Sequence, residues 1–112
     1  MIKINGTEID VNKFPDGTFH LNFDDLNHER FDIVWNFEDN DEMIVLMFLT
    51  RHLQSHGINN IYLYMPYIPN ARQDRVKTYK DVFTLKYFAE FINSLNFTKV
   101  TVLDPHSPVS EA

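Results

Sequence analysis

Three short apolar segments alternate with two longer segments of helical periodicity from residue 31 onward, and this order constrains the fold more than any other feature. The apolar segments are 31–37, 60–65 and 99–104. Strands that alternate with helices along a chain form a parallel sheet, because each helix returns the chain to the same end of the sheet. The sequence therefore predicts an α/β fold: an open, mainly parallel sheet with flanking helices.

The first helix is predicted between Asp39 and Gly57. Asp39 and Glu42 form the D-x-x-E pattern of a capping box, and Gly57 is a plausible residue to end the helix. From Met43 to Leu49 the helix is apolar nearly all round. Such a helix is usually covered on more than one side. We therefore expect the sheet to cover one face and a partner subunit to cover the other.

The second helix is predicted over residues 84–95, with Thr84 as its N-cap. Its apolar residues recur at helical spacing and define one stripe: Leu85, Phe88, Ala89, Ile92 and Leu95. Residues 60–65, before it, are mostly apolar and are predicted to form a buried strand. The last residues, 107–112, are expected to open another helix.

The first quarter of the chain is predicted to form β-hairpins. Asn5-Gly6 lies between two short apolar-polar alternations, which is typical of a tight type I′ turn. Residues 15–17, Pro-Asp-Gly, make a second turn. The alternation of Phe19, Leu21 and Phe23 then places three apolar side chains on one face of a strand.

Composition narrows the class of protein. A chain of 112 residues is enough for one compact domain, and a net charge of −6 argues against a broad basic face for nucleic acid. With no cysteine there is neither a disulfide framework nor a thiolate metal site. The N-terminus lacks the apolar stretch of a secretory signal, and the longest apolar run, 43–49, is too short to span a membrane. We expect a cytoplasmic protein that binds neither nucleic acid nor membrane.

Polar residues gather where the predicted strands end. Residues 38–41 follow the first parallel strand, 66–75 follow the second, and 104–107 follow the third. Ligands of open parallel sheets bind beyond the carboxyl ends of the strands. The sequence therefore predicts a binding site at this edge of the sheet.

Two pairs of residues carry the candidate chemistry. Arg72 can grip phosphate oxygens and Gln73 can read a base edge, although a solvated charged loop remains an alternative for this segment. Asp104 and His106 can meet one divalent cation or bracket a phosphate. The alternative for Asp104 is that it caps the following turn.

Several segments resemble the ribose-phosphate pyrophosphokinases, also called phosphoribosyl pyrophosphate synthetases. MPYIPNARQDR resembles their PY-x-x-x-ARQDR segment, and FPDGT is similar to their F-S/P-D-G-E turn. NDEMIVLMFL is similar to their N-D-x-L-M-E-L-L helix, FTLKYFAEFIN to their S/T-x-K helix, and VLDPHS to their D-L-H-A/S strand end. Order and spacing agree over residues 14–107.

The resemblance implies a phosphoribosyltransferase-like fold and an activity. The family transfers the β,γ-diphosphoryl group of ATP to the 1-hydroxyl of ribose 5-phosphate, with Mg²⁺ as cofactor. Arg72, Gln73 and His106 would contact ATP, and His106 would act in catalysis. Asp104 and His106 would lie by the metal. In a homo-oligomer, Phe14 and Asp16 would reach the adenine bound to the neighbouring subunit.

The chain also departs from the family pattern. Thr18 stands where the family usually has Glu, and the N-terminal hairpin replaces a strand-helix-strand opening, as in a divergent, phage-type member. The glycine-rich D-D-x-x-x-T-G-G-T loop of the family's second domain is absent from this sequence, which has only three glycines. We therefore expect residues 1–112 to be a single domain, the N-terminal half of a two-domain enzyme, and inactive alone. A non-catalytic regulatory or assembly relative and a small nucleotide-binding module are the alternatives.

Overall fold

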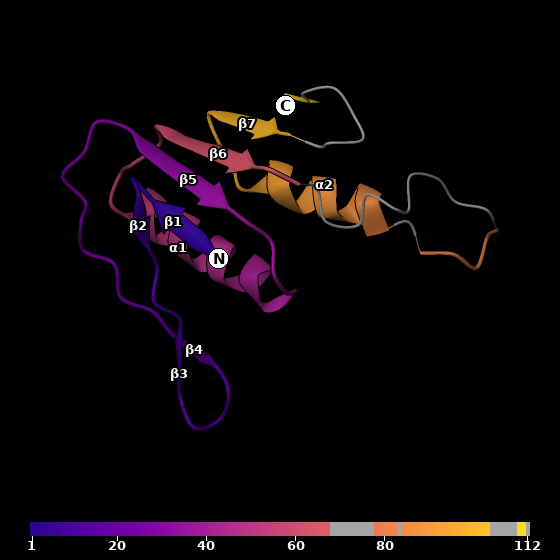
Figure 1. Ribbon diagram of the computed structural model, residues 1–112, viewed down its shortest axis with the longest axis horizontal. Coiled ribbons are helices and arrows are strands. Elements are labelled where there is room, and N and C mark those ends of the chain that lie inside the picture. The colour runs from indigo at the N-terminus through magenta and orange to yellow at the C-terminus, as the bar shows by residue number, and fades with distance from the viewer. Residues whose placement is uncertain (68–77, 83, 104–109, 112) are drawn as a thin grey trace.

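The computed structural model describes residues 1–67, 78–82, 84–103 and 110–111 (Figure 1). A six-stranded sheet has the order β2-β1-β5-β6-β7-β8, and a separate hairpin pairs β3 with β4. The strands of the large sheet are β1 (Ile2–Ile4), β2 (Thr7–Glu8), β5 (Phe31–Trp35), β6 (Ile61–Met65), β7 (Lys99–Val102) and β8 (Ser110–Glu111). The hairpin strands are β3 (Asn12–Lys13) and β4 (Phe19–His20), and the helices are α1 (Asp41–Ser55) and α2 (Thr84–Ser94).

The centre of the large sheet is parallel, as the alternation of strands and helices predicts. β6 pairs in parallel with β5 on one side and with β7 on the other. β1 is antiparallel to β5 and β8 is antiparallel to β7, so antiparallel strands flank the parallel centre. The predicted α/β class with a mainly parallel sheet is therefore confirmed.

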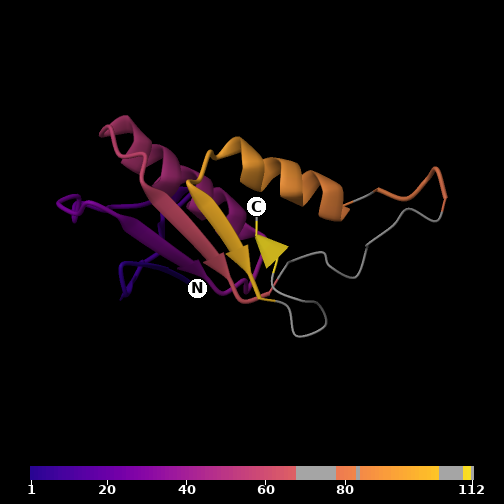
Figure 2. The same cartoon turned by 90° about the horizontal axis from the view of Figure 1, so that it is seen from above.

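Both helices lie on the same face of the sheet (Figure 2). Every second side chain of the central strands is buried in the core, which also includes side chains of both helices. The buried strand residues are Phe31, Ile33 and Trp35 of β5 and Ile61, Leu63 and Met65 of β6. Burial on alternate positions is what a sheet covered on one face requires, since successive side chains point to opposite faces.

The other face of the sheet is only half-buried, which corrects the prediction that 60–65 is a buried strand. Tyr62 and Tyr64 of β6 lie on this face. Arg30 lies over the ring of Tyr62, 3.6 Å from its centroid, and donates to Asp32 at 2.9 Å and to the Tyr64 hydroxyl at 3.1 Å. The two tyrosines made the segment look apolar in the sequence, but a tyrosine hydroxyl is polar and can remain in contact with water.

Both predicted ends of α1 are confirmed. Asp39 Oδ1 accepts from the Glu42 N–H at 3.2 Å, and Glu42 Oε1 accepts from the Asp39 N–H at 3.4 Å, which is the reciprocal pairing of a capping box. At the other end Gly57 has φ +78°, and its N–H and that of Ile58 bond to carbonyls of the last turn. This left-handed glycine ends the helix in a Schellman motif.

One side of α1 faces the core and another side is open. Val45, Leu46, Leu49 and Leu53 are buried. Ile44 and Phe48 are 43% and 46% exposed. The part of the chain that the structure describes covers α1 on the sheet side, so a subunit contact on the open side remains a prediction.

The helix α2 follows its predicted range closely. Thr84 is its first residue, and the residue before it lies outside the described part of the chain. Phe88 and Ile92 are buried on the predicted stripe, but Ala89 is exposed, so the predicted stripe was too wide at that position. Within the described residues, the longest apolar helical stretch falls short of what crossing a bilayer would need.

The prediction of a helix at the end of the chain is wrong at Ser110 and Glu111. These residues form β8, with Val102 opposite Ser110 and Thr101 opposite Glu111. An edge strand such as β7 presents a row of N–H and C=O groups that need partners, and a second strand supplies them. The prediction of a helix used only the local sequence, which carries no information about the unpaired edge of β7.

The predicted N-terminal hairpins are present. Asn5 and Gly6 both have positive φ, +48° and +84°, as a type I′ turn requires. In the second hairpin, Phe19, Leu21 and Phe23 are half-buried while the residues between them are exposed, which confirms the predicted alternation. The strand itself is shorter than expected, because ladder pairing covers only Phe19 and His20.

Candidate functional site

The carboxyl ends of the three parallel strands meet at one edge of the sheet. Val34 is level with Tyr64, and Met65 is level with Val102. The chain leaves this edge from β6 through Tyr67 into residues 68–77, and from β7 through Leu103 into residues 104–109. Arg72, Gln73, Asp104 and His106 lie in these two segments, outside the described residues. The structure thus places the starting points of both segments side by side, and the roles of the four residues remain predictions.

A row of aromatic rings leads from the core to this edge. The ring centroids of Trp35 and Phe37 are 5.6 Å apart, and those of Phe37 and Tyr67 are 6.4 Å apart. Trp35 is fully buried, whereas Tyr67 is half exposed. The end of β6, from which the segment with Arg72 departs, is therefore connected to the buried core through a chain of tilted aromatic rings.

A hollow of about 360 Å³ lies where α1 and α2 begin. Its lining consists of uncharged residues: Asn40, Met43, Val82, Thr84, Tyr87 and Phe88. Because Asn40 follows the end of β5, this hollow is on the carboxyl side of the sheet. The described part of its lining carries no charge, so a cation that binds phosphate here would have to come from elsewhere, as the predicted role of Arg72 requires.

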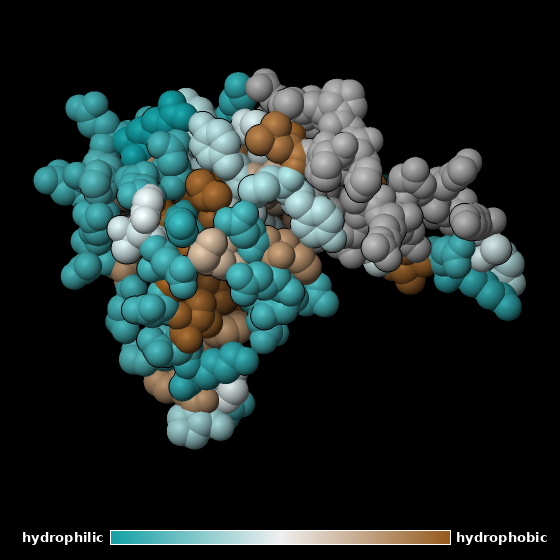
Figure 3. Space-filling model, viewed as in Figure 1, coloured by the Kyte–Doolittle hydropathy of each residue, from teal (hydrophilic) through white to brown (hydrophobic). Residues whose placement is uncertain are grey.

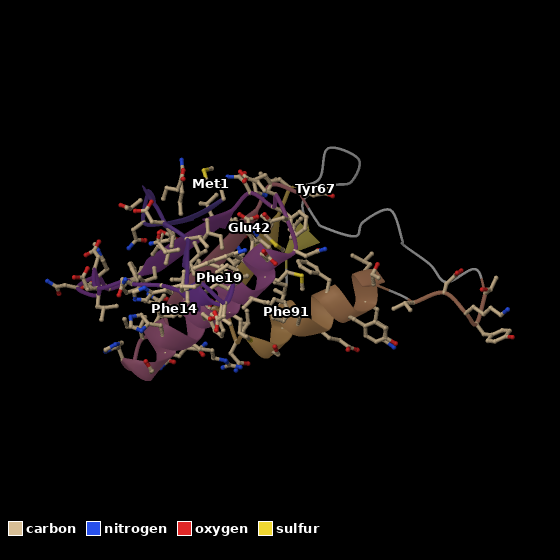
Figure 4. The ribbon with its side chains drawn as sticks, turned by 90° about the horizontal axis from the view of Figure 1, so that it is seen from below. Met1, Phe14, Phe19, Glu42, Tyr67 and Phe91 are labelled. Carbon is tan, nitrogen blue, oxygen red and sulfur yellow. The ribbon has the colours of Figure 1, made fainter. Side chains whose placement is uncertain are left out.

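Glu42 is the most heavily hydrogen-bonded carboxylate of the described residues. It accepts from the Met1 amine, from Trp35 Nε1 at 3.3 Å and from the Glu38 N–H at 2.7 Å. Figure 4 shows Met1 and Glu42 at the same end of the sheet. Burial raises the pKa of the Glu42 carboxyl, but these hydrogen bonds outweigh burial, and the pKa is lowered from its ordinary value of 4.5. The sequence gave only the capping box as a signal; nothing in it pointed to the amine or the indole.

We predict that Glu42 makes stability depend on acidity. A carboxylate with a lowered pKa in the folded state stabilises the protein above its ordinary pKa and loses this contribution as the pH falls through the folded value. The free energy of unfolding should therefore fall below pH 4.5, the ordinary pKa of Glu42. In Glu42→Gln this fall should be smaller, whereas Glu90→Gln, at an exposed position on α2, should keep it. Urea unfolding between pH 3 and 7 (about one unit per step) measures the difference.

The β3–β4 hairpin carries the two other predicted site residues. Phe14 is 48% exposed, and one face of its ring stacks on His20, with centroids 4.7 Å apart and planes 15° apart. The turn is closed by bonds from the Phe14 N–H to the Thr18 carbonyl at 2.8 Å and from the Gly17 N–H to the Phe14 carbonyl at 2.9 Å. The stacking partner His20 was not predicted from the sequence.

Asp16 is held within the same turn. Its Oδ1 accepts from the Thr18 hydroxyl at 2.7 Å and from the Thr18 N–H at 3.0 Å. The hydroxyl bond first, and the N–H bond second, lower the pKa of Asp16, so the carboxylate stays ionised. Thr18, which replaces the Glu of the family pattern, is thus engaged inside the turn.

The structure does not bring the hairpin tip to the carboxyl edge within one chain. Figure 4 shows Phe14 and Tyr67 well apart, with Glu42 between them. The hairpin is tied to the start of α1 by an ion pair between Lys13 and Asp41 at 3.3 Å. Phe14 and Asp16 could therefore contribute to a site at that edge only on another subunit, which is the arrangement that the family resemblance implies.

The described residues contain no group of three or more His, Asp or Glu side chains that could hold a metal ion. Asp104 and His106 lie outside the described part of the chain. A carboxylate and an imidazole suit a divalent cation that also binds phosphate oxygens, so the Mg²⁺ site remains a prediction for these two residues.

The fold defines the class: an open α/β domain with polar segments at the carboxyl edge of its parallel strands. Residues 1–95 match the sequence profile of the N-terminal domain of ribose phosphate pyrophosphokinase. The chain therefore belongs to this family, as the resemblance of its motifs predicted.

Curated relatives agree with this membership. The chain is 28% identical over 101 residues to the ribose-phosphate pyrophosphokinase of Bacillus subtilis, an alignment that covers 88% of this chain and 32% of the relative. It is 22% identical over 103 residues to that of Pyrococcus furiosus, covering 91% of this chain and 37% of the relative. For Bacillus caldolyticus the identity is 27% over 103 residues, covering 88% and 32%. The chain thus spans about a third of the length of these relatives.

Proposed function

We propose that this chain is the ATP-binding half of an enzyme that makes phosphoribosyl pyrophosphate. The observation that carries the proposal is family membership over residues 1–95 together with the sheet edge from which both predicted ATP segments depart. The relatives that the chain matches are named ribose-phosphate pyrophosphokinases, and the chain corresponds to about a third of each. The ribose 5-phosphate site would belong to a second domain.

The proposed reaction moves a diphosphoryl group as one unit. The 1-oxygen of ribose 5-phosphate attacks the β-phosphorus of ATP, the bond between the β-phosphorus and the bridging oxygen to the α-phosphorus breaks, and AMP leaves. The hydroxyl of the sugar loses its proton. Such a transfer needs alignment and neutralisation of charge more than covalent assistance.

The predicted residues share the tasks of this scheme. Arg72 binds phosphate oxygens, Gln73 lies near the base, and His106 contacts the triphosphate at the reacting end. Asp104 and His106 would hold Mg²⁺, which neutralises phosphate charge when bound. These four residues sit on segments that start at neighbouring strand ends.

Phe14 and Asp16 are proposed to contact the adenine on a neighbouring subunit. The exposed ring of Phe14, backed by His20, offers one free face for stacking. Asp16 adds an ionised acceptor in a closed turn. Both features suit a flat base that carries amino groups. Both are formed within the β3–β4 hairpin itself.

A turnover assay tests the proposal. The 112-residue chain alone should bind ATP·Mg²⁺ weakly and release no AMP from ATP and ribose 5-phosphate. A polypeptide that joins this chain to a ribose-phosphate-binding second domain of the family should release AMP. Robust turnover by the isolated chain would refute the division of labour, and a joined polypeptide that folds but never releases AMP would favour a regulatory or assembly role.

A further inference from the structure

The turn between β1 and β2 contains the one asparagine of the sequence that precedes a glycine. Asn5 and Gly6 are the two central residues of this turn. Beyond the chain neighbours of Gly6, no described atom lies within 4 Å of the place where a Cβ would stand. Figure 3 shows hydrophilic side chains over the left of the molecule, where β1 and β2 meet in Figure 1. The turn is therefore open to water.

An asparagine that precedes a glycine can lose its side-chain amide group in water. The backbone nitrogen of Gly6 gives up its proton and attacks Cγ of Asn5, so a C–N bond forms and the bond from Cγ to Nδ2 breaks. Nδ2 leaves as ammonia with that proton, and a five-membered succinimide ring remains. Water then opens the ring at either carbonyl, which gives aspartate or isoaspartate at residue 5. Glycine favours the attack because it has no Cβ to crowd its nitrogen.

The fold holds the carboxamide of Asn5 at two points beside β5. Oδ1 accepts from the Asp32 N–H at 2.8 Å, and Nδ2 donates to the Arg30 carbonyl at 3.2 Å. The backbone N–H of Asn5 also donates to the Asp32 carbonyl at 2.9 Å. The side chain thus adds one rung to the antiparallel ladder between β1 and β5. Because the carboxamide has to turn before Cγ can meet the Gly6 nitrogen, both side-chain bonds must break first.

We propose that Asn5 is a deamidation site that the pairing of β1 with β5 keeps closed. Ile2 and Ile4 are 3% and 2% exposed and fix β1 to the core, so the contacts of Asn5 last while β1 stays paired. A reaction that needs an open form proceeds at the rate of the unprotected peptide multiplied by the fraction of molecules that are open. The separation of β1 from β5 therefore sets the rate of deamidation.

The modification also weakens the return of β1 to the sheet. In the aspartate product an oxygen replaces Nδ2 and faces the Arg30 carbonyl, so two acceptors meet where a donor and an acceptor met. In the isoaspartate product the main chain gains one carbon within a two-residue turn, which no longer fits the pairing of Ile4 with Thr7. Opening thus permits deamidation, and deamidation favours the open form, so the change runs in one direction.

Peptide mapping by mass spectrometry measures the conversion of residue 5 during incubation of the chain at mildly alkaline pH. The folded chain should convert at least about tenfold more slowly than a free peptide of residues 1–10. Ile4→Val loosens β1 and should raise the rate in the folded chain about threefold or more, because buried methyl groups hold the strand. Ile92→Val is the matched control: Ile92 is equally buried, at 4% exposure, but lies on α2. Its rate should stay close to that of the wild type.

The effect of the product is measured on Asn5→Asp, which is the aspartate form itself. Its urea midpoint should lie below that of the wild type. Asn22→Asp adds the same charge at an exposed position and should keep the wild-type midpoint. Circular dichroism confirms that each variant is folded during incubation.

Three outcomes overturn the proposal. It is wrong if the folded chain converts as fast as the peptide, or if Ile92→Val speeds conversion as much as Ile4→Val does. It is also wrong if Asn5→Asp is as stable as the wild type. None of these measurements involves ATP, so they are independent of the proposed function.

Discussion

Replacement of Trp35 by alanine is expected to lower the free energy of unfolding by about 3–5 kcal/mol, the usual cost of removing a large buried aromatic side chain. Trp35 is 0% exposed and lies at the centre of the aromatic packing, 5.6 Å from Phe37 and 5.9 Å from Phe88 between ring centroids. Its loss leaves a cavity between β5 and α2 and also removes the indole N–H that Glu42 accepts. Since the free energy of unfolding of a small domain is about 5–15 kcal/mol in total, this loss would be a large fraction of the stability.

Urea unfolding followed by far-UV circular dichroism measures this effect, because the chain has one tryptophan and the variant loses it as a fluorescent probe. Tyr87→Ala is the matched control: an aromatic side chain on α2 that is 54% exposed. Its change should stay within about 0.5 kcal/mol. A Trp35→Ala variant as stable as the control would mean that the core is not where the structure places it.

Replacement of Arg72 by alanine is expected to lower kcat/KM for ATP about 100-fold to 1,000-fold in a polypeptide that carries both domains, the usual cost of losing one donor to developing charge. A guanidinium can bind two phosphate oxygens with parallel hydrogen bonds, and an ammonium cannot. Arg72→Lys should therefore recover only part of the loss. The rate of AMP formation at varied ATP concentration gives the constants.

Lys86→Ala is the control for simple loss of positive charge. Lys86 is an exposed cation on α2, with its Nζ 5.8 Å from the ring of Tyr87. Its removal should leave kcat/KM unchanged. Wild-type kinetics in Arg72→Ala would return the segment 72–75 to the alternative of a solvated charged loop.

Local signals in the sequence predicted most of the fold. The capping box at Asp39 and Glu42 and the glycine at residue 57 located both ends of α1, because each acts through bonds to backbone within a few residues. The alternation of strands and helices then indicated the parallel sheet. The predictions failed where a segment distant in the sequence determines the local structure. β8 forms because β7 offers an unpaired edge, and one face of β6 stays open because both helices lie on the opposite face of the sheet.

The predictions about the site also divide into those that local motifs supported and those that depended on distant contacts. Motif spacing identified the family, which residues 1–95 confirm, and the topology explains why both predicted ATP segments begin at one edge. The sequence gave no sign that the Met1 amine would meet Glu42 or that His20 would back Phe14, since each contact depends on the folding of the N-terminal strands around α1.

The most direct test is whether one polyphosphate lies between the arginine–glutamine pair and the aspartate–histidine pair. Nuclear magnetic resonance of the isotopically labelled chain can detect weak binding when ATP is added with Mn²⁺, whose unpaired electrons broaden signals of nearby nuclei. The amide signals of Arg72, Gln73, Asp104 and His106 should broaden together, and neither Mn²⁺ without ATP nor ATP with Mg²⁺ should reproduce the pattern. Broadening confined to one pair, or centred elsewhere on the molecule, would contradict a shared nucleotide site.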